Sequence, residues 1–98
     1  MTAVEKTEEF DTWLKALRDA RAKAKIISRI ERLADGNPGD VKPVGNGIIE
    51  MRIHYGPGYR VYYCQQGETI VIILCGGDKD SQAKDIETAK EIKESLEG

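Results

Sequence analysis

A run of six apolar residues, Ile70 to Cys75, constrains the fold more than any other feature of the sequence. A strand that is covered on one face alternates apolar and polar residues, whereas this run is apolar at every position. The run is far too short to cross a bilayer. It therefore predicts a central strand, at about residues 69–75, whose two faces are both covered by other elements.

Turn residues divide the stretch before this run into two further strands. Residues 56–58 read Gly-Pro-Gly and residues 66–67 read Gln-Gly, and both segments are typical of turns. Strands are therefore expected at 48–55 and 59–65, each followed by a tight connection.

The N-terminal part predicts a short edge strand followed by a helical hairpin. The edge strand is expected within residues 3–9, and apolar residues at helical spacing predict helices at 10–17 and 19–35. Asp19 is the expected N-cap of the longer helix, and Gly36 ends it. The apolar stripe of this helix is expected to comprise Ile26, Ile27, Ile30, Leu33 and Ala34.

A last helix is expected at residues 82–96, with Ser81 as its N-cap, and residues 40–47 are expected to form a loop. Gly76-Gly77 is expected to break the sheet before that helix. The order β-α-α-β-β-β-α describes one α+β domain over residues 1–98. It has a small, mostly antiparallel sheet, an N-terminal helical hairpin and a C-terminal helix.

Charge is distributed unevenly along a chain whose net charge is only −2. Residues 66–98 hold four basic and eight acidic residues, so the acidity is concentrated in the last third. Proteins that bind nucleic acids usually carry a basic excess, so the overall balance disfavours that class without excluding a local basic patch. The predicted helical hairpin is rich in Lys and Arg, and its surface is most simply interpreted as a solvated face.

The two cysteines, Cys64 and Cys75, are expected to be small buried hydrophobes. Strand pairing across the intervening turn leaves them several residues out of register, which is too far for a disulfide. Neither has a Cys or His at ligand spacing, so no metal site is expected.

Glu5, Glu8 and Glu9 fall where a signal peptide would need apolar residues. A cytoplasmic protein with no membrane partner is therefore expected.

Alternation along the predicted strands gathers polar side chains on one face of the sheet. Pairing across the Gly-Pro-Gly turn places His54 opposite Arg60 and Arg52 opposite Tyr62, with facing side chains about 5 Å apart. Two guanidiniums, an imidazole and a phenol suit an anion such as phosphate. Two interpretations stay open: a phosphate site, or an exposed face whose arginines pair with Glu50 or with acids of the last helix.

Two segments give the chain a resemblance to a known family. Residues 50–63, Glu-Met-Arg-Ile-His-Tyr-Gly-Pro-Gly-Tyr-Arg-Val-Tyr-Tyr, resemble the Glu-Leu-Arg…Gly-Tyr-Arg-Val-Tyr-Tyr block of RelE/ParE-type toxins. Residues 76–86 match the Gly-Gly-Asp-Lys-x-x-Gln-x-x-Asp-Ile signature of the HigB-like "addiction module killer protein" branch. The expected order of elements is also that of the family, so the resemblance covers nearly the whole chain.

The resemblance implies the toxin of a type II toxin–antitoxin pair. Many members of that family cut messenger RNA in the ribosomal A site without a metal or other cofactor. They are neutralised by an antitoxin, often a helix-turn-helix protein. The ribose 2′-hydroxyl attacks the phosphate, so no protein nucleophile is needed. The first hypothesis is therefore a ribosome-dependent endoribonuclease (an mRNA interferase). The alternatives are a ParE-like DNA gyrase poison without nuclease activity and a degenerate member that only binds its antitoxin.

The resemblance also implies roles for individual residues. Arg60 matches the most recurrent arginine of the family and, with Lys79, would stabilise charge on the phosphate. Arg52 would position the phosphate, and His54 would act as a general acid or base. Contacts with RNA are expected for Arg52, Arg60, Tyr62, Lys79 and Lys84.

Two departures from the family pattern concern the general base. Glu50 stands where RelE has a lysine, and Asp85 stands roughly where RelE has a tyrosine. The base is therefore open among Glu50, His54 and Asp85. The nuclease hypothesis is lost if Arg52 and Arg60 lie on opposite faces of the sheet, or if buried carboxylates hold both of them.

Overall fold

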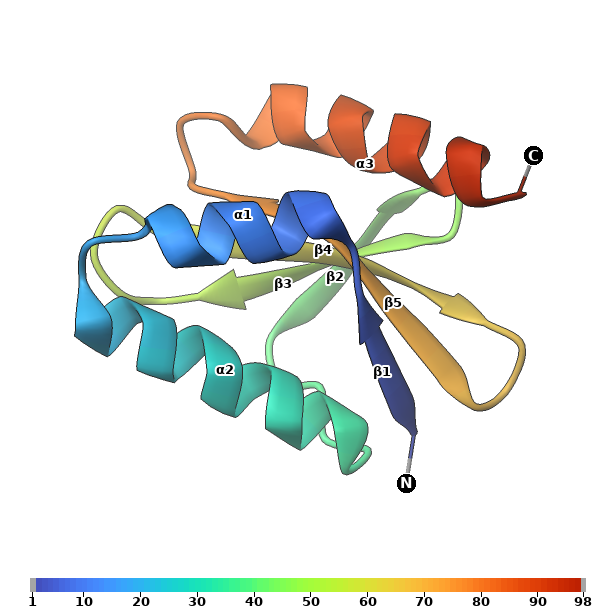
Figure 1. Ribbon diagram of the computed structural model, residues 1–98, viewed down its shortest axis with the longest axis horizontal. Coiled ribbons are helices and arrows are strands. Elements are labelled where there is room, and N and C mark those ends of the chain that lie inside the picture. Colours follow the sequence, from blue (N-terminus) through green and yellow to red (C-terminus); the bar gives the residue numbers. More distant parts are fainter. Residues whose placement is uncertain (1, 98) are drawn as a thin grey trace.

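A five-stranded sheet separates two helical layers in the computed structural model, which describes residues 2–97 (Figure 1). The strand order is β1-β5-β4-β3-β2, with β1 parallel to β5 and every other neighbouring pair antiparallel. The elements are β1 (Ala3–Lys6), α1 (Glu8–Ala16), α2 (Ala20–Ala34), β2 (Val41–Gly45), β3 (Ile48–Ile53), β4 (Tyr59–Gln66), β5 (Ile70–Gly77) and α3 (Gln82–Glu97).

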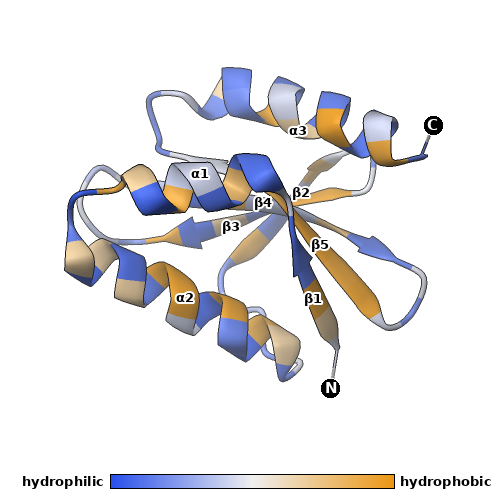
Figure 2. Ribbon diagram, viewed as in Figure 1, coloured by the Kyte–Doolittle hydropathy of each residue, from blue (hydrophilic) through white to orange (hydrophobic). Residues whose placement is uncertain are grey.

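The prediction of a strand covered on both faces is confirmed by β5, which lies between β1 and β4 and is apolar along most of its length in Figure 2. Its side chains alternate between two hydrophobic cores. Ile73 packs in the core under α1 and α2, whereas Leu74 packs in the core under α3, and both are completely buried. The apolar run is therefore long enough to supply both layers.

The helical hairpin covers one face of the sheet. Phe10 of α1 and Ile26 of α2 are fully buried against β3, β4 and β5. Asp19 caps α2 as predicted, because its carboxylate accepts from the backbone of Arg21 and Ala22. Ile27, which was expected in the buried stripe, is 44% exposed and points away from the core.

The predicted edge strand is too long and the predicted first helix begins too late. Thr7 follows β1 directly and caps α1: its hydroxyl accepts from the Phe10 backbone and donates to the Leu74 carbonyl at 2.7 Å. Because the cap satisfies a helix donor and a sheet acceptor together, the chain changes from strand to helix at this residue.

The prediction of a loop over 40–47 is wrong, because β2 occupies most of it and pairs with β3. Asn46 and Gly47 both have positive φ, 56° and 75°, as a two-residue hairpin turn requires. Pro43 does not prevent the pairing, because β2 is an edge strand and its register shifts between Pro43 and Gly45. The sheet therefore has one strand more than the sequence predicts.

The two glycines expected to break the sheet extend β5 instead. Gly76 pairs with Val61 and Gly77 with Arg60. A Cβ on Gly76 would lie 2.4 Å from the Trp13 ring, and a Cβ on Gly77 would lie 1.7 Å from the Asp85 carboxylate. Glycine is needed here because one neighbouring side chain presses on each face of the strand.

Cys64 and Cys75 are both free and buried, as predicted. Their strand partners are Ile72 and Tyr62, so the two sulfurs are not in register with each other. Burial raises the pKa of the Cys75 thiol to about 12, which keeps it protonated near neutral pH.

No helix within the described residues has the length and apolar composition needed to cross a membrane.

Candidate functional site

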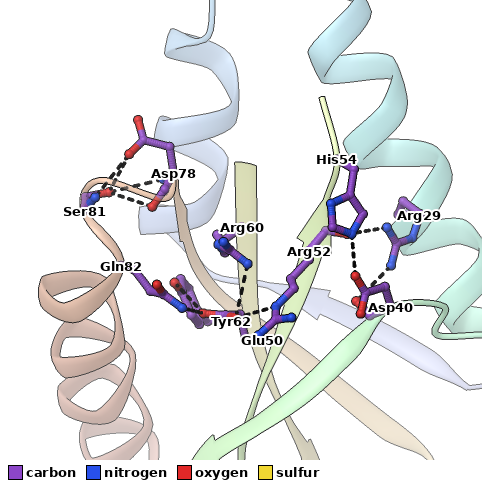
Figure 3. A network of polar contacts seen from close by, with 10 residues as sticks. All are labelled: Arg29, Asp40, Glu50, Arg52, His54, Arg60, Tyr62, Asp78, Ser81 and Gln82. Carbon is purple, nitrogen blue, oxygen red and sulfur yellow. Dashed lines mark hydrogen bonds and ion pairs between the residues drawn. The ribbon is translucent and has the colours of Figure 1, made fainter. Parts of the chain in front are cut away.

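Five of the predicted site residues lie in one polar network at one end of the sheet: Glu50, Arg52, His54, Arg60 and Tyr62. Figure 3 shows this network running from the start of α3, through a carboxylate at its centre, to the end of β3 and the side of α2. It joins residues of α2, β3, β4 and α3, so it is built from segments that are far apart in the chain.

The predicted strand pairing is wrong by two residues. Arg52 lies opposite Arg60, and Glu50 lies opposite Tyr62. The expectation was Arg52 opposite Tyr62 and His54 opposite Arg60. The side chains of Arg52, Arg60 and Tyr62 still share one face of the sheet as predicted, because a shift of two residues keeps each side chain on the same side of its strand.

The error comes from the turn, which is five residues long rather than three. β3 ends at Ile53, and residues 54–58 form the connection to β4. Backbone bonds from Tyr55 to the Ile53 carbonyl (2.9 Å) and from Gly58 to the Tyr55 carbonyl (3.1 Å) hold this turn. His54 is therefore part of the turn and has no partner on β4.

Glu50 is the centre of the network. Its carboxylate is completely buried and accepts from four side chains that approach from β3, β4 and α3. The donors are Arg52 Nε at 3.1 Å, Arg60 Nη1 at 3.4 Å, the Tyr62 hydroxyl at 3.2 Å and Gln82 Nε2 at 2.6 Å. A buried carboxylate is tolerated only when it is paired in this way.

The nuclease hypothesis requires that Arg52 and Arg60 share one face of the sheet and that buried carboxylates do not hold both of them. The structure meets the first condition but not the second. Arg52 and Arg60 lie on the same face of the sheet, but both are held by the buried Glu50. The nuclease hypothesis is therefore lost in its first form, in which both guanidiniums are free to hold a phosphodiester. One carboxylate is shared by two guanidiniums, so the three side chains together keep one positive charge.

The exposure of the two arginines differs. The Arg52 side chain is 32% exposed, whereas that of Arg60 is 13% exposed and its buried Nε has no hydrogen-bond partner within the described residues. Arg52 is thus the arginine that a ligand can reach. Arg60 and Glu50 form the layer beneath it.

Tyr62 does not reach the surface, so the predicted contact between Tyr62 and RNA is not formed in this arrangement. Burial, followed by the neighbouring Glu50 carboxylate, raises the pKa of the Tyr62 hydroxyl far above its usual range. The hydroxyl therefore stays protonated and serves as a donor to Glu50.

His54 lies at the edge of the network with its side chain 75% exposed, and its Nε2 is 2.5 Å from Asp40 Oδ2. The hydrogen bond from His54 holds the pKa of the Asp40 carboxyl below its ordinary value. The Asp40 carbonyl also accepts from the Arg52 backbone at 3.0 Å. Asp40 is thus fixed beside β3 and orients the imidazole.

Asp40 and Arg29 were both missed by the sequence prediction. Arg29 of α2 donates to the Arg52 carbonyl at 2.6 Å and to the Pro38 carbonyl at 3.1 Å, so it ties α2 to the end of β3. Counting back from the Asn46-Gly47 turn places residue 41 opposite Arg52, and only the register shift between Pro43 and Gly45 brings Asp40 beside it, so the sequence alone could not have found Asp40. No local signal indicates that Arg29 crosses to β3.

The remaining predicted residues lie around the start of α3. Lys79 is exposed, and its Cβ lies 3.5 Å from the position of a Cβ on Gly58, so it borders the turn at 54–58. Lys84 is exposed on α3. Asp85 is half-buried and accepts from the hydroxyl of Ser81, which thus bonds to a side chain rather than to the helix backbone as an N-cap would.

The three candidates for the general base have different surroundings. Glu50 is buried under four donors, and Asp85 is bonded to Ser81, whereas His54 is open to solvent. Only His54 can meet a substrate proton without rearrangement of the network. Within residues 2–97, no three His, Cys, Asp or Glu side chains gather closely enough to hold a metal ion.

Comparison with known proteins identifies the family. A family model described as "Phage derived protein Gp49-like (DUF891)" matches residues 12–96. The chain belongs to the Gp49-like family. This family is of the RelE/Gp49 toxin-like type and is associated with the toxins of toxin–antitoxin pairs. The resemblance is thus confirmed at that level, but not at the level of the HigB-like branch or of RelE/ParE itself.

The Gp49-like chain is 53% identical, over 93 residues, to an uncharacterized protein of Haemophilus influenzae strain KW20 / Rd. The alignment covers 95% of this chain and 94% of that protein, so the similarity extends over nearly the whole of both sequences. No solved structure matches the Gp49-like chain.

Proposed function

We propose that this Gp49-like protein is the toxin of a type II toxin–antitoxin pair, and that it acts in the cytoplasm as a ribosome-dependent endoribonuclease. Membership of a family associated with such toxins supports the first part. The second part revises the nuclease hypothesis so that Arg52 alone meets the phosphate. It rests on one observation: Arg52 and Arg60 share a single buried carboxylate, so one positive charge is left among the three side chains, and the Arg52 side chain is 32% exposed. Its protein partner would be a cognate antitoxin of the helix-turn-helix kind.

The proposed chemistry assigns different tasks to the two arginines. Glu50 holds Arg60 in place beneath the surface, and Arg52 contacts a phosphate oxygen through the part of its side chain that is exposed. Lys79, beside the turn at 54–58, adds a second exposed cation. Fixed cations stabilise the charge that builds up on the phosphate during attack.

His54 is the proposed acid–base group. Asp40 holds one ring nitrogen, which leaves the other to take the proton from the ribose 2′-hydroxyl. The 2′-oxygen then bonds to phosphorus, and the bond from phosphorus to the 5′-oxygen breaks. The leaving 5′-oxygen takes a proton from water, and the protonated His54 returns its proton to the solvent. The products are a 2′,3′-cyclic phosphate and a 5′-hydroxyl end.

The same carboxylate favours a second candidate function. Because Glu50 already occupies both arginines, the face would bind a phosphodiester less strongly than two free guanidiniums would. A toxin that binds a protein target such as DNA gyrase, or a member that binds only its antitoxin, needs no such pocket.

Mapping of transcript ends in cells after induction separates these functions. We expect growth arrest and new 5′ ends within translated transcripts for the wild type, with both lost in Arg52→Gln and Arg60→Ala. Arg52→Gln is the decisive variant because Arg52 is the more exposed of the two and its loss perturbs the fold less. DNA breaks with intact transcripts would identify a gyrase poison. Absence of any arrest by the wild type would identify a member that only binds its antitoxin.

A further inference from the structure

The helix α2 carries a row of cations. Arg21, Lys25, Arg29 and Arg32 follow one another at intervals of three or four residues, which places them along one side of the helix. Arg18 lies just before the N-cap of the helix. Arg18, Arg21, Lys25 and Arg32 are exposed, and none of the four has an acidic partner at ion-pair distance within the described residues. We call these five residues the α2 basic row.

The local charge around this row is strongly positive although the chain is acidic. Residues 15–32 contain seven Lys or Arg and two acids. One of those acids, Asp19, is engaged by the start of α2 and by the Tyr55 hydroxyl at 2.8 Å. Residues 82–97, which form α3 on the opposite face of the sheet, contain three Lys and five acids. The two helical layers therefore carry opposite charge.

The spacing of the α2 basic row is not explained by helix stability. Lys25 lies four residues from Arg21 and four from Arg29, and like charges at this spacing each destabilise an exposed helix by about 0.2–0.5 kcal/mol. A solvated helix face is more stable when residues of opposite charge alternate along it at this spacing. The row is thus arranged to meet negative charge from outside the molecule.

The row is continuous with the candidate site. The Lys25 ammonium lies 5.3 Å from the centre of the Tyr55 ring, in the turn that also carries His54. Arg29 bonds directly to the Arg52 carbonyl. A polymer that lies along α2 therefore arrives at Arg52 and His54.

We propose that the α2 basic row binds the sugar–phosphate backbone of single-stranded RNA next to the nucleotide at the candidate site. The inference rests on the proposed function, because RNA is the polyanion that such a toxin would cut. The helix rises about 1.5 Å per residue, so residues 21–32 span about 16 Å, or about five nucleotides at the stacked spacing of about 3.4 Å. Ile27 is the only large apolar side chain exposed on α2 in the described chain. A protein interface needs a larger apolar centre than one isoleucine.

The test uses a 2′-O-methyl RNA oligonucleotide, which the proposed mechanism cannot cleave because attack needs a free 2′-hydroxyl. Binding is measured at several salt concentrations for the wild type, for R21Q/K25Q and for K6Q/K90Q. The last variant is the matched control. It also removes two positive charges, from β1 and α3, which carry no residue of the row.

We expect R21Q/K25Q to bind the oligonucleotide at least tenfold more weakly. Each phosphate contact on single-stranded nucleic acid contributes about 0.7 to the slope of log affinity against log salt. The slope should therefore fall by about 1.4 in R21Q/K25Q and remain unchanged in K6Q/K90Q. Equal slopes for the two double variants would overturn the proposal.

Two further measurements keep the interpretation unambiguous. Thermal melts of both variants should match the wild type, because every substituted side chain lies on the surface or only partly buried. Polyglutamate serves as an acidic polypeptide probe, and binding of polyglutamate without binding of RNA would assign the row to a protein partner instead. Because the oligonucleotide is not cleaved, this result is independent of whether the wild type is a nuclease.

Discussion

At the scale of single residues, Glu50 decides how the candidate site can work. A fully buried carboxylate loses its hydration, and this chain compensates with four side-chain donors, two of which carry charge. The arrangement fixes Arg60 and Arg52 in position, and it also reduces the positive field that they offer to a ligand. Stability and function therefore depend on the same carboxylate.

Replacement of Glu50 by alanine should be strongly destabilising. The change leaves two guanidiniums close together with no counter-charge and leaves the buried Tyr62 hydroxyl without its acceptor. Breaking a buried pair in this way costs about 3–5 kcal/mol. Urea denaturation should show that loss for Glu50→Ala. It should show little change for Glu87→Ala, whose carboxylate forms an exposed pair with Lys90. Equal stabilities of the two variants would contradict this role of Glu50.

The pair of Asp40 and His54 makes a prediction about pH. The hydrogen bond from His54 lowers the pKa of Asp40 below 3.8 in the folded protein. A depressed carboxyl pKa adds stability above the unfolded value, and that stability is lost as the pH falls through the folded value. In NMR titrations the Asp40 carboxyl should titrate below 3.8 in the wild type and return towards 3.8 in His54→Gln. An Asp40 titration that does not change in His54→Gln would show that the imidazole does not hold this carboxylate.

At the scale of elements, the sequence predicts best where burial dictates the pattern. The apolar run in β5 and the helical spacing in α2 were correctly assigned because each must fill a core. The strand β2 was missed because it is a short edge strand containing Pro43. The error of two residues at the turn after β3 arose because turn length depends on backbone bonds between residues that composition does not specify. The contact between Gln82 and Glu50 joins positions 32 residues apart, which no local pattern can indicate.

The junction between β5 and α3 offers a test at the element scale. A methyl group on Gly77 would overlap the Asp85 carboxylate, and overpacking of this kind costs about 1–3 kcal/mol. Gly77→Ala should therefore lower stability, and the loss should be smaller in an Asp85→Ala background, where the overlapping carboxylate is absent. A double-mutant cycle on urea midpoints measures the difference. Additive effects would show that Asp85 does not press on this glycine.

At the scale of the whole molecule, the sheet joins two layers that differ in charge and share their strands. The basic layer of α2 and the acidic layer of α3 lie on opposite faces, so a chain with a small net charge still presents one surface suited to a polyanion. The strands β4 and β5 contribute alternate side chains to both hydrophobic cores. A substitution that destabilises one core should therefore also destabilise the other, because the two cores share these strands.

This coupling predicts a single unfolding transition for both layers. Leu74 is fully buried in the core under α3, whereas Trp13, the only tryptophan, packs on the opposite face beside Phe10. Leu74→Ala should cost about 2–5 kcal/mol. The midpoint followed by Trp13 fluorescence should fall as far as the midpoint followed by circular dichroism, because a domain of this size unfolds cooperatively. Leu96→Ala, at a position that is 48% exposed, should move neither midpoint appreciably. If Leu74→Ala lowered the circular dichroism midpoint but not the fluorescence midpoint, the two layers would be separate folding units, and the shared strands would not transmit stability between them.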